Sequence, residues 1–298
     1  MSQSDNLMSK LKSKSILKVG GAFDAMSAKL VEIYNFDAIW AGSFGISATH
    51  ALPDASIMTM TEFLSVAANM VESCTIPVIA DCDTGFGGPS NVSHMIRKYE
   101  KVGVAGVSIE DKIFPKQNSL LKNGKQELLS EKDFVSKIIA AKETKINKNF
   151  MIIARVEALI AGLGIDEALK RAKSYEKAGA DAILIHSNSN KPDQIFEFCD
   201  SWGGSVPLIT IPTTYPVVRI NELVAHKVKM VIYANQTLRT SFLAMSRMLQ
   251  QVSKADSLND VDLKMSSMEE IFHIQEMYKI KNQEKNIESE LKRLGYVS

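Results

Sequence analysis

Short apolar segments alternate with longer segments of helical spacing along most of this chain. A short apolar run bounded by turn signals is typical of a buried strand, whereas apolar residues three and four positions apart are typical of a helix. The pattern predicts strands at residues 16–19, 36–41, 76–80, 105–109, 150–154, 182–185, 206–211 and 228–234. It predicts helices at 25–33, 61–71, 91–101, 130–144, 165–177, 193–201 and 238–252, and one more between the last two strands.

Eight alternations of strand and helix predict a parallel sheet closed into a (β/α)8 TIM barrel. An open, doubly wound sheet is the alternative, but no glycine-rich dinucleotide fingerprint follows the first strand. We expect residues 1–255 to form the barrel and residues 256–298 a C-terminal helical extension with a charged tail. Residues 268–275 have the spacing of an extra helix, and we interpret 282–293 as a loose tail rather than a solvated helix.

Composition limits the classes of partner. The 298 residues are 45% hydrophobic and carry a net charge of +1, which argues against general binding to nucleic acid or to an acidic membrane surface. No apolar run approaches the roughly 20 residues that span a bilayer. The three cysteines are too few and too widely spaced for a disulfide framework or a zinc site. We therefore expect a cytoplasmic protein that acts on a small molecule.

One stretch indicates chemistry. The apolar run Gly106–Ile109 ends in the acidic pair Glu110-Asp111, and a polar segment without any period follows over Lys112–Gln126. Long loops of this kind in compact domains are usually lids, binding loops or disordered. A strand-end acid followed by a lid with Lys116 and Asn118 favours chemistry on an anionic substrate, although a solvated turn is the alternative.

Other predicted strands also end in polar side chains. Asp81 and Asp83 follow the third strand, Arg155 and Glu157 the fifth, and His186-Ser187 the sixth. In a barrel, catalytic groups lie at the carboxyl ends of the strands. On an extended chain Asp81 and Asp83 face the same side, and with Glu110 they form an all-oxygen cluster suited to Mg²⁺ or Mn²⁺. Turn and cap aspartates are the alternative for this pair, and a structural ion pair with Glu157 is the alternative for Arg155.

Four motifs carry a family resemblance. They are Asp81-Cys82-Asp83-Thr84-Gly85-Phe86-Gly87, Glu110-Asp111-Lys112 with Phe114-Pro115-Lys116, Ala154-Arg155-Val156-Glu157-Ala158, and Gly179-Ala180-Asp181-Ala182 running to His186-Ser187. Over residues 15–280 the chain resembles the phosphoenolpyruvate mutase/isocitrate lyase superfamily, and within it the mutases and phosphonopyruvate hydrolase. The resemblance implies a barrel that exchanges its last helix with a neighbour in a homodimer or homotetramer. It also implies Mg²⁺ held mainly by Asp81, with Asp83 and Glu110 acting through water.

The lid segment separates the activities within that superfamily. Lys116-Gln117-Asn118-Ser119 is similar to the mutase pattern, whereas the hydrolase has Thr at the position of Asn118 and the lyases have a Cys-containing segment. The resemblance therefore implies a mutase that interconverts phosphoenolpyruvate and phosphonopyruvate by a loose, metaphosphate-like transfer. A hydrolase that releases pyruvate and phosphate is the alternative, because segments 157–164 and 212–216 resemble it as much. A catalytically silent binding or assembly module is the third hypothesis.

The resemblance also implies the site residues. Catalytic roles fall to Asp54, Lys116, Asn118, Arg155 and His186; substrate binding to Trp40, Gly42, Ser43, Phe44, Asp81, Arg155, His186 and Ser187; and the metal to Asp81, Asp83 and Glu110. One departure affects this set. Relatives read Trp-(Gly/Ala)-Ser-Gly after the second strand, but here the serine stands one position later, at Ser43. Which hydroxyl and amides hold a phosphoryl group is therefore open.

Overall fold

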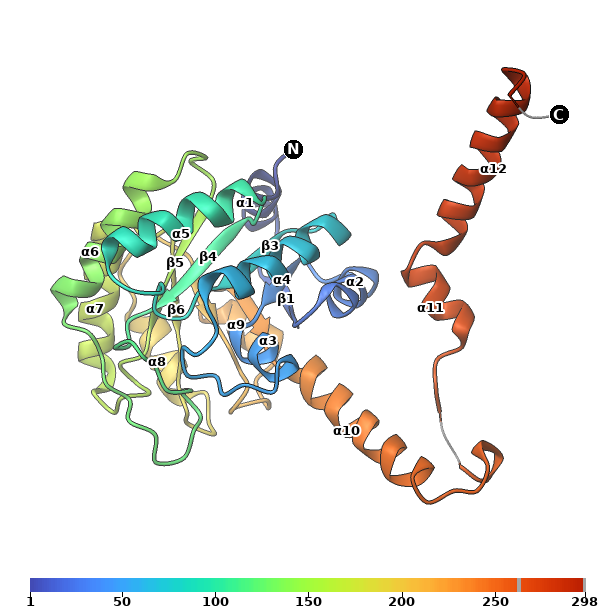
Figure 1. Ribbon diagram of the computed structural model, residues 1–298. Coiled ribbons are helices and arrows are strands. Elements are labelled where there is room, and N and C mark those ends of the chain that lie inside the picture. The colour runs from blue at the N-terminus through green and yellow to red at the C-terminus, as the bar shows by residue number, and fades with distance from the viewer. Residues whose placement is uncertain (262–263, 297–298) are drawn as a thin grey trace. The chain divides into compact units, whose positions relative to one another are not determined.

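The computed structural model describes residues 1–261 and 264–296. Within them, eight parallel strands pair in chain order and close into a barrel, β8 with β1 (Figure 1). The strands are β1 (Leu17–Ala22), β2 (Ala38–Ala41), β3 (Val78–Asp81), β4 (Gly106–Glu110), β5 (Met151–Val156), β6 (Ala182–Ile185), β7 (Leu208–Thr210) and β8 (Val228–Tyr233). The predicted TIM barrel is confirmed.

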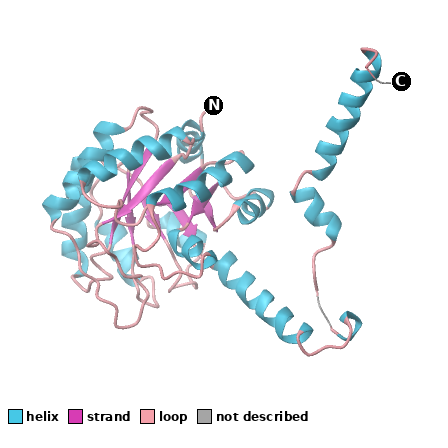
Figure 2. Cartoon of the chain, in the orientation of Figure 1, coloured by secondary structure: helices cyan, strands magenta, loops and turns pink. Residues whose placement is uncertain are grey.

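Helices cover the outside of the barrel (Figure 2). They are α2 (Ala25–Ile33), α3 (Ser43–Thr49), α4 (Met60–Ser73), α5 (Pro89–Lys101), α6 (Glu131–Thr144), α7 (Gly164–Ala178), α8 (Asp193–Ser201) and α9 (Ile220–Ala225). Helix α10 (Gln236–Val252) follows β8 and has no buried side chain. Local signals set several bounds: the Ser130 side chain accepts a hydrogen bond from the Asp133 amide at the start of α6, and Gly179 ends α7 in the left-handed conformation. Helix α3 lies between the predicted strand 36–41 and the predicted helix 61–71, where the sequence pattern predicted no element.

The core has two layers. Inward-facing strand side chains such as Val19, Trp40, Ile153 and Ile232 fill the barrel, and a larger cluster lies between the strands and the outer helices. The N-terminal segment, in which the sequence showed no element, forms α1 (Gln3–Ser13). Its Leu7 joins the cluster inside the barrel, and the side-chain oxygen of Gln3 accepts a hydrogen bond from the Val78 amide at the start of β3. Helix α1 therefore covers the end of the barrel at which the strands begin.

Residues Met1–Thr240 and Ser241–Ser298 form separate compact units, so the expected boundary at residue 255 stays a prediction. The second unit contains most of α10, the short helix η1 (Leu258–Asp260), α11 (Met268–Ile274) and α12 (Met277–Arg293). The loose tail expected over 282–293 is wrong, since that segment is part of α12. No described helix is both long enough and apolar enough to cross a membrane.

Gly20 and Gly21 lie inside β1 rather than closing it, and Gly21 explains why. A Cβ atom at Gly21 would lie 2.1 Å from the carbonyl oxygen of Ala234, which follows β8. The backbones approach this closely where the last strand closes against the first. A glycine is required at this position because a backbone carbonyl has little freedom to move aside.

Gly21→Ala should lower the free energy of unfolding by about 2–3 kcal/mol, the upper part of the range for overpacking. Gly203→Ala is the control, since no atom lies within 4 Å of a Cβ there. Urea denaturation followed by circular dichroism measures both. Equal stability of the two variants would contradict the close approach.

Candidate active site

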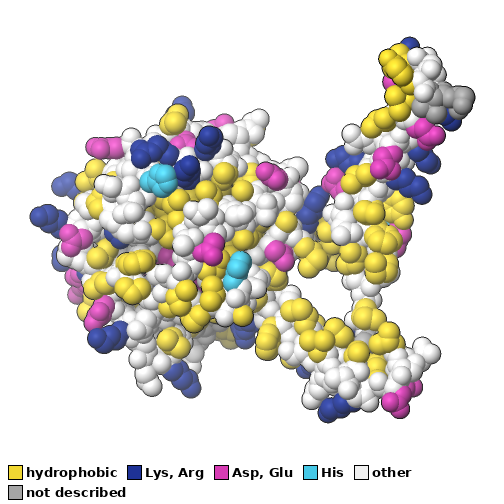
Figure 3. Space-filling model, in the orientation of Figure 1, with side chains coloured by type: hydrophobic (Ala, Val, Ile, Leu, Met, Phe, Trp, Pro, Cys, Tyr) yellow, Lys and Arg dark blue, Asp and Glu magenta, His cyan; other side chains and the backbone are white. Residues whose placement is uncertain are grey.

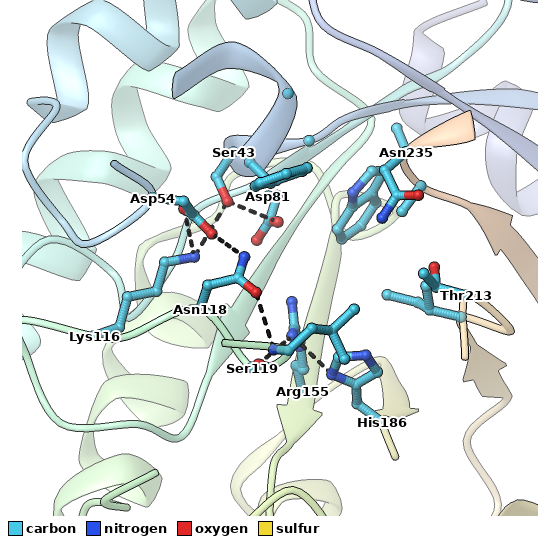
Figure 4. A pocket seen from close by; sticks show the side chains of 17 residues that line it. Ser43, Asp54, Asp81, Lys116, Asn118, Ser119, Arg155, His186, Thr213 and Asn235 are labelled. Atoms are coloured by element: carbon cyan, nitrogen blue, oxygen red, sulfur yellow. Dashed lines mark hydrogen bonds and ion pairs between the residues drawn. The ribbon is translucent and has the colours of Figure 1, made fainter. Parts of the chain in front are cut away.

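The carboxyl ends of β2 to β8 surround a cavity of about 90 Å³ (Figure 4). Strand pairing places Glu110 at the end of β4 directly beside Arg155 of β5. The lining residues are Trp40, Gly42, Ser43, Phe44, Gly45, Asp54, Asp81, Lys116, Asn118, Ser119, Leu120, Arg155, His186, Ile211, Thr213, Ala234 and Asn235. The strand ends predicted to form a site therefore do meet in one place.

A buried lysine lies at the centre of the acidic side of this cavity. The Lys116 ammonium is 3.0 Å from Asp54 Oδ1, 2.7 Å from Asp83 Oδ1 and 3.9 Å from Glu110 Oε1. Figure 4 shows Lys116 approaching Asp54, Ser43 and Asp81 from the lid. Burial lowers the pKa of Lys116, but the charges of Asp83, Glu110 and Asp54 raise it by more. The net pKa is therefore well above its ordinary value. The amine is therefore a permanent cation.

A backbone turn that the sequence did not indicate follows Asp81 and sets the direction of the Asp83 side chain. Strand β3 ends at Asp81, and Asp83 has a φ of 48°, so the assumption of an extended chain over these residues is wrong. The Asp81 carboxylate accepts a hydrogen bond from Ser43 Oγ at 3.0 Å, while Asp83 turns back toward Lys116. Burial raises the pKa of Asp83 to about 7, with Lys116 opposing and the neighbouring carboxylates adding to the shift.

The donor set fits a hard divalent cation. Asp83 Oδ1 is paired with the Lys116 ammonium at 2.7 Å. Among the described residues, neither buried oxygen of Glu110 accepts a hydrogen bond, although they lie 3.9 Å from Lys116 Nζ and 3.4 Å from Arg155 Nη1. Buried acceptors of this kind require an explanation, and oxygen ligands suit Mg²⁺. In the described part of the chain, no three His, Cys, Asp or Glu side chains lie close enough to bind a metal ion together. The Lys116 ammonium lies among the oxygens of Asp54, Asp83 and Glu110.

Charge balance leads to the same conclusion. The carboxylates of Asp54, Asp81, Asp83, Glu110 and Glu157 lie around the ammonium groups of Lys112 and Lys116 and the guanidinium of Arg155. These described groups have two more negative than positive charges when all five carboxylates are ionised and His186 is neutral, and one more when Asp83, with its raised pKa, is protonated. A divalent cation at this place would remove the excess.

A second group of side chains faces the opposite part of the cavity. Arg155 Nη2 lies 2.9 Å from His186 Nδ1, and its Nε donates a hydrogen bond to Glu157. Arg155 Nη1 lies 3.4 Å from Glu110 Oε2. The sequence left two roles open for Arg155, a site residue or a structural ion pair with Glu157. In the structure it has both positions, because it pairs with Glu157 and lines the cavity.

The protonation of this group follows from its partners. Burial raises the pKa of Glu157, but Arg155 and His186 lower it by more. The net pKa is therefore well below its ordinary value. Burial lowers the pKa of His186, with Glu157 opposing, and the net pKa is lowered. A neutral imidazole accepts a hydrogen bond from Arg155, whereas a protonated one would donate to Glu157 at 3.0 Å. The neutral form is favoured here.

Asp111 holds Glu157 in place. Its carboxylate accepts hydrogen bonds from the Glu157 amide at 2.9 Å, Tyr175 Oη at 2.7 Å and Arg171 Nη1 at 3.1 Å. Burial raises the pKa of Asp111 to about 6. The acidic pair 110–111 is thus divided: Glu110 faces the cavity side and Asp111 anchors β5 and α7.

The lid closes over the cavity. Asn118 Nδ2 donates to Asp54 Oδ2 at 2.7 Å, and the Lys116 amide donates to Ser56 Oγ at 3.1 Å. These bonds join the lid to the loop after α3. The predicted lid is therefore an ordered segment, anchored by polar contacts to another part of the barrel mouth.

Most of the expected site residues line this cavity, with three exceptions. Asp83 and Glu110 lie behind the lining, in contact with Lys116. Ser187 does not line the cavity; it is buried and donates to Gln194 at 2.6 Å. The sequence reasoning missed Thr213 and Asn235, which follow β7 and β8 and could have been found by the same strand-end rule.

Comparison with known proteins places this geometry in a family. The family model described as phosphoenolpyruvate phosphomutase matches residues 8–253. The chain belongs to that family. It is 40% identical to phosphonopyruvate hydrolase of Variovorax sp. (strain Pal2), over 92% of this chain and 95% of the relative.

Two crystal structures resemble the whole chain. Phosphoenolpyruvate phosphomutase from Streptomyces platensis subsp. rosaceus has a TM-score of 0.93 and 41% identity, and the match covers 95% of this chain and 98% of that one. Phosphonopyruvate hydrolase in complex with oxalate and Mg²⁺ has a TM-score of 0.89 and 38% identity, over 96% and 99%. The chain is therefore an enzyme of the phosphoenolpyruvate mutase/isocitrate lyase superfamily, with relatives of two activities at similar identity.

Glu157→Gln should destabilise this member of the family. The variant removes the buried charge that pairs with Arg155 and Lys112, and breaking one side of a buried ion pair costs about 3–5 kcal/mol. Glu127→Gln is the control, since the exposed pair with Lys125 should contribute less than about 1 kcal/mol. Both values come from urea denaturation. A loss at Glu157 no greater than at Glu127 would show that the buried network is not a structural requirement.

Proposed function

We propose that this enzyme is a phosphoenolpyruvate mutase that interconverts phosphoenolpyruvate and phosphonopyruvate. The observation that carries the proposal is the closed lid, in which Asn118 is bound to Asp54 and Lys116 is buried among carboxylates. Moving a phosphoryl group between an enol oxygen and a methylene carbon requires that water be kept away from a loose, metaphosphate-like species. A lid that is held closed by Asn118 and Lys116 would keep water away from the phosphoryl group.

The cavity supplies the charge that such a transfer needs. Arg155 presents a guanidinium, and a neutral His186 beside it can donate from its other ring nitrogen. Together they hold the equatorial oxygens of the phosphoryl group. Lys116 and Asn118 close over the group from the lid, and Asp54 orients both of them. Trp40, Gly42, Ser43 and Phe44 line the cavity and are the proposed substrate-binding residues, whereas Ser187, which does not line it, is not proposed for this role.

Mg²⁺ is the proposed cofactor, held mainly by Asp81 with Asp83 and Glu110 acting through water. When bound, it stabilises the negative charge of the pyruvate enolate. The relative that was crystallised with oxalate and Mg²⁺ supports this assignment. So do the buried oxygens of Glu110 that have no hydrogen-bond partner among the described residues.

Phosphonopyruvate hydrolase is the second candidate. It is favoured by the 40% identity to the Variovorax enzyme over nearly the whole chain. The same cavity would perform hydrolysis if the lid admitted one water molecule beside the phosphoryl group. The two candidates therefore differ in the lid rather than in the strand ends.

A phosphorus NMR time course on phosphonopyruvate separates the two activities. We expect the phosphonate signal to be replaced by that of phosphoenolpyruvate in the presence of Mg²⁺, and no change after EDTA treatment because the carboxylates then lack their cation. Phosphate appearing first, without phosphoenolpyruvate, would assign the enzyme to the hydrolases. No conversion at all would favour the silent binding module.

Asn118→Ala should lower kcat by about 100-fold, the usual loss for one donor in a preorganised site. Asn123→Gly at the exposed lid tip is the matched control, since its φ of 59° suits glycine. Steady-state assays of both variants measure the effect. A loss below threefold in Asn118→Ala would mean that the lid assignment is wrong.

We also propose that the enzyme is a cytoplasmic homodimer or homotetramer that exchanges its last barrel helix between subunits. Helix α10 has no buried side chain, and Phe242, Leu243, Met245 and Leu249 are exposed on it. Figure 3 shows hydrophobic side chains along the C-terminal segment. A second copy of the chain would cover them. The three buried free cysteines suit a reducing compartment.

Phe242→Asp should convert the oligomer to a monomer, because it places a charge in the proposed interface. Gln251→Asp, two and a half turns further along α10, is the control and should leave the assembly intact. Light scattering after gel filtration gives the mass of each. A wild-type monomer would contradict helix exchange directly.

A further inference from the structure

Lys112 has no role in the chemistry described above, although it is one of the most buried charged side chains. It lies two residues after Glu110, at the start of the lid, and 1% of its surface is exposed. Its ammonium donates to the Gln117 carbonyl oxygen at 2.9 Å and to Ser119 Oγ at 2.7 Å. It also lies 3.5 Å from Glu157 Oε2. A buried ammonium is stable only when its donors are all used, and two of these partners belong to the lid.

The Ser119 hydroxyl connects this lysine to the other side of the cavity. It donates to Glu157 Oε2 at 2.7 Å and accepts from Arg155 Nη2 at 3.1 Å as well as from Lys112. Glu157 in turn pairs with Arg155 and lies next to His186. The lid and the two side chains proposed to hold the phosphoryl group therefore share one carboxylate.

We propose that Lys112 is a positioning residue that latches the lid closed and couples its closure to the orientation of Arg155 and His186. If the lid moved away, Lys112 would keep only Glu157 at 3.5 Å, and Arg155 would lose the Ser119 oxygen. The phosphoryl-holding pair is then fully oriented only while the lid excludes water. The consequence for water exclusion rests on the proposed function, whereas the latch itself does not.

The latch is tested first on the ligand-free protein by hydrogen–deuterium exchange. Lys112→Met keeps most of the length of the side chain and removes the charge. We expect exchange over residues 113–126 to rise by about tenfold, the effect of losing a buried charged hydrogen bond, with peptides from β5 and β6 unchanged. Lys125→Met is the matched control, because that lid lysine is exposed and its ammonium pairs with Glu127, which is also exposed.

Ser119→Ala provides an independent route if Lys112→Met does not fold. It should also speed exchange in the lid, and the double variant should exchange more slowly than the product of the two single effects, because both substitutions remove the bond between Lys112 and Ser119. Lid exchange in Lys112→Met and Ser119→Ala equal to that in Lys125→Met would overturn the latch. So would independent, multiplying effects of the two substitutions.

Turnover of phosphonopyruvate gives the second readout. Lys112→Met should lower kcat more than it changes KM, and should raise the fraction of phosphorus released as phosphate at least threefold, since the lid no longer excludes water. Unchanged partitioning together with faster lid exchange would leave the latch in place and remove its link to the chemistry. A wild-type enzyme without turnover would refute the proposed function, and exchange would still decide the latch.

Discussion

The structure depends on cationic side chains that pair with the carboxylates buried at the carboxyl ends of the strands. Asp54, Asp83 and Glu110 all lie near one lysine from the lid, and Glu157 lies near Arg155 and a second lysine. Carboxylates removed from water are tolerated only with such partners. The lid is consequently part of the electrostatic structure of the barrel, and its ordered conformation follows from the charges beneath it.

The fold could be predicted because its signals are local. Apolar runs marked the strands to within two or three residues, and features such as Ser130 and Gly179 marked helix ends. Helix α1 escaped because only Leu7 and its neighbours are buried, and they are buried against the inside of a barrel formed later in the chain. Helix α12 escaped because residues 282–293 are mostly charged and polar, with Ile287 and Leu291 as their apolar side chains.

The sequence indicated which residues belong to the candidate site better than it indicated how they are arranged. Residue type and strand-end position identified Asp81, Glu110, Arg155 and His186, but not the turn that brings Asp83 to Lys116. Nor could a sequence show that Asp111 faces α7 while Glu110 faces Lys116. Such assignments depend on which face of the strand each side chain occupies and on partners far away in the chain. The displaced serine is a further example, since Ser43 is bound to Asp81.

Helix α1 limits the routes by which reactant and product can reach the cavity. Because its Leu7 and Leu11 pack with the side chains that fill the barrel, the interior offers no passage from the end where the strands begin. Within the described residues, the cavity lies at the other end of the barrel, where lid residues 116 and 118–120 line it, so we expect reactant and product to pass beneath the lid. Each turnover then requires that the lid open twice, and the rate of that movement sets an upper limit on how fast the enzyme can work.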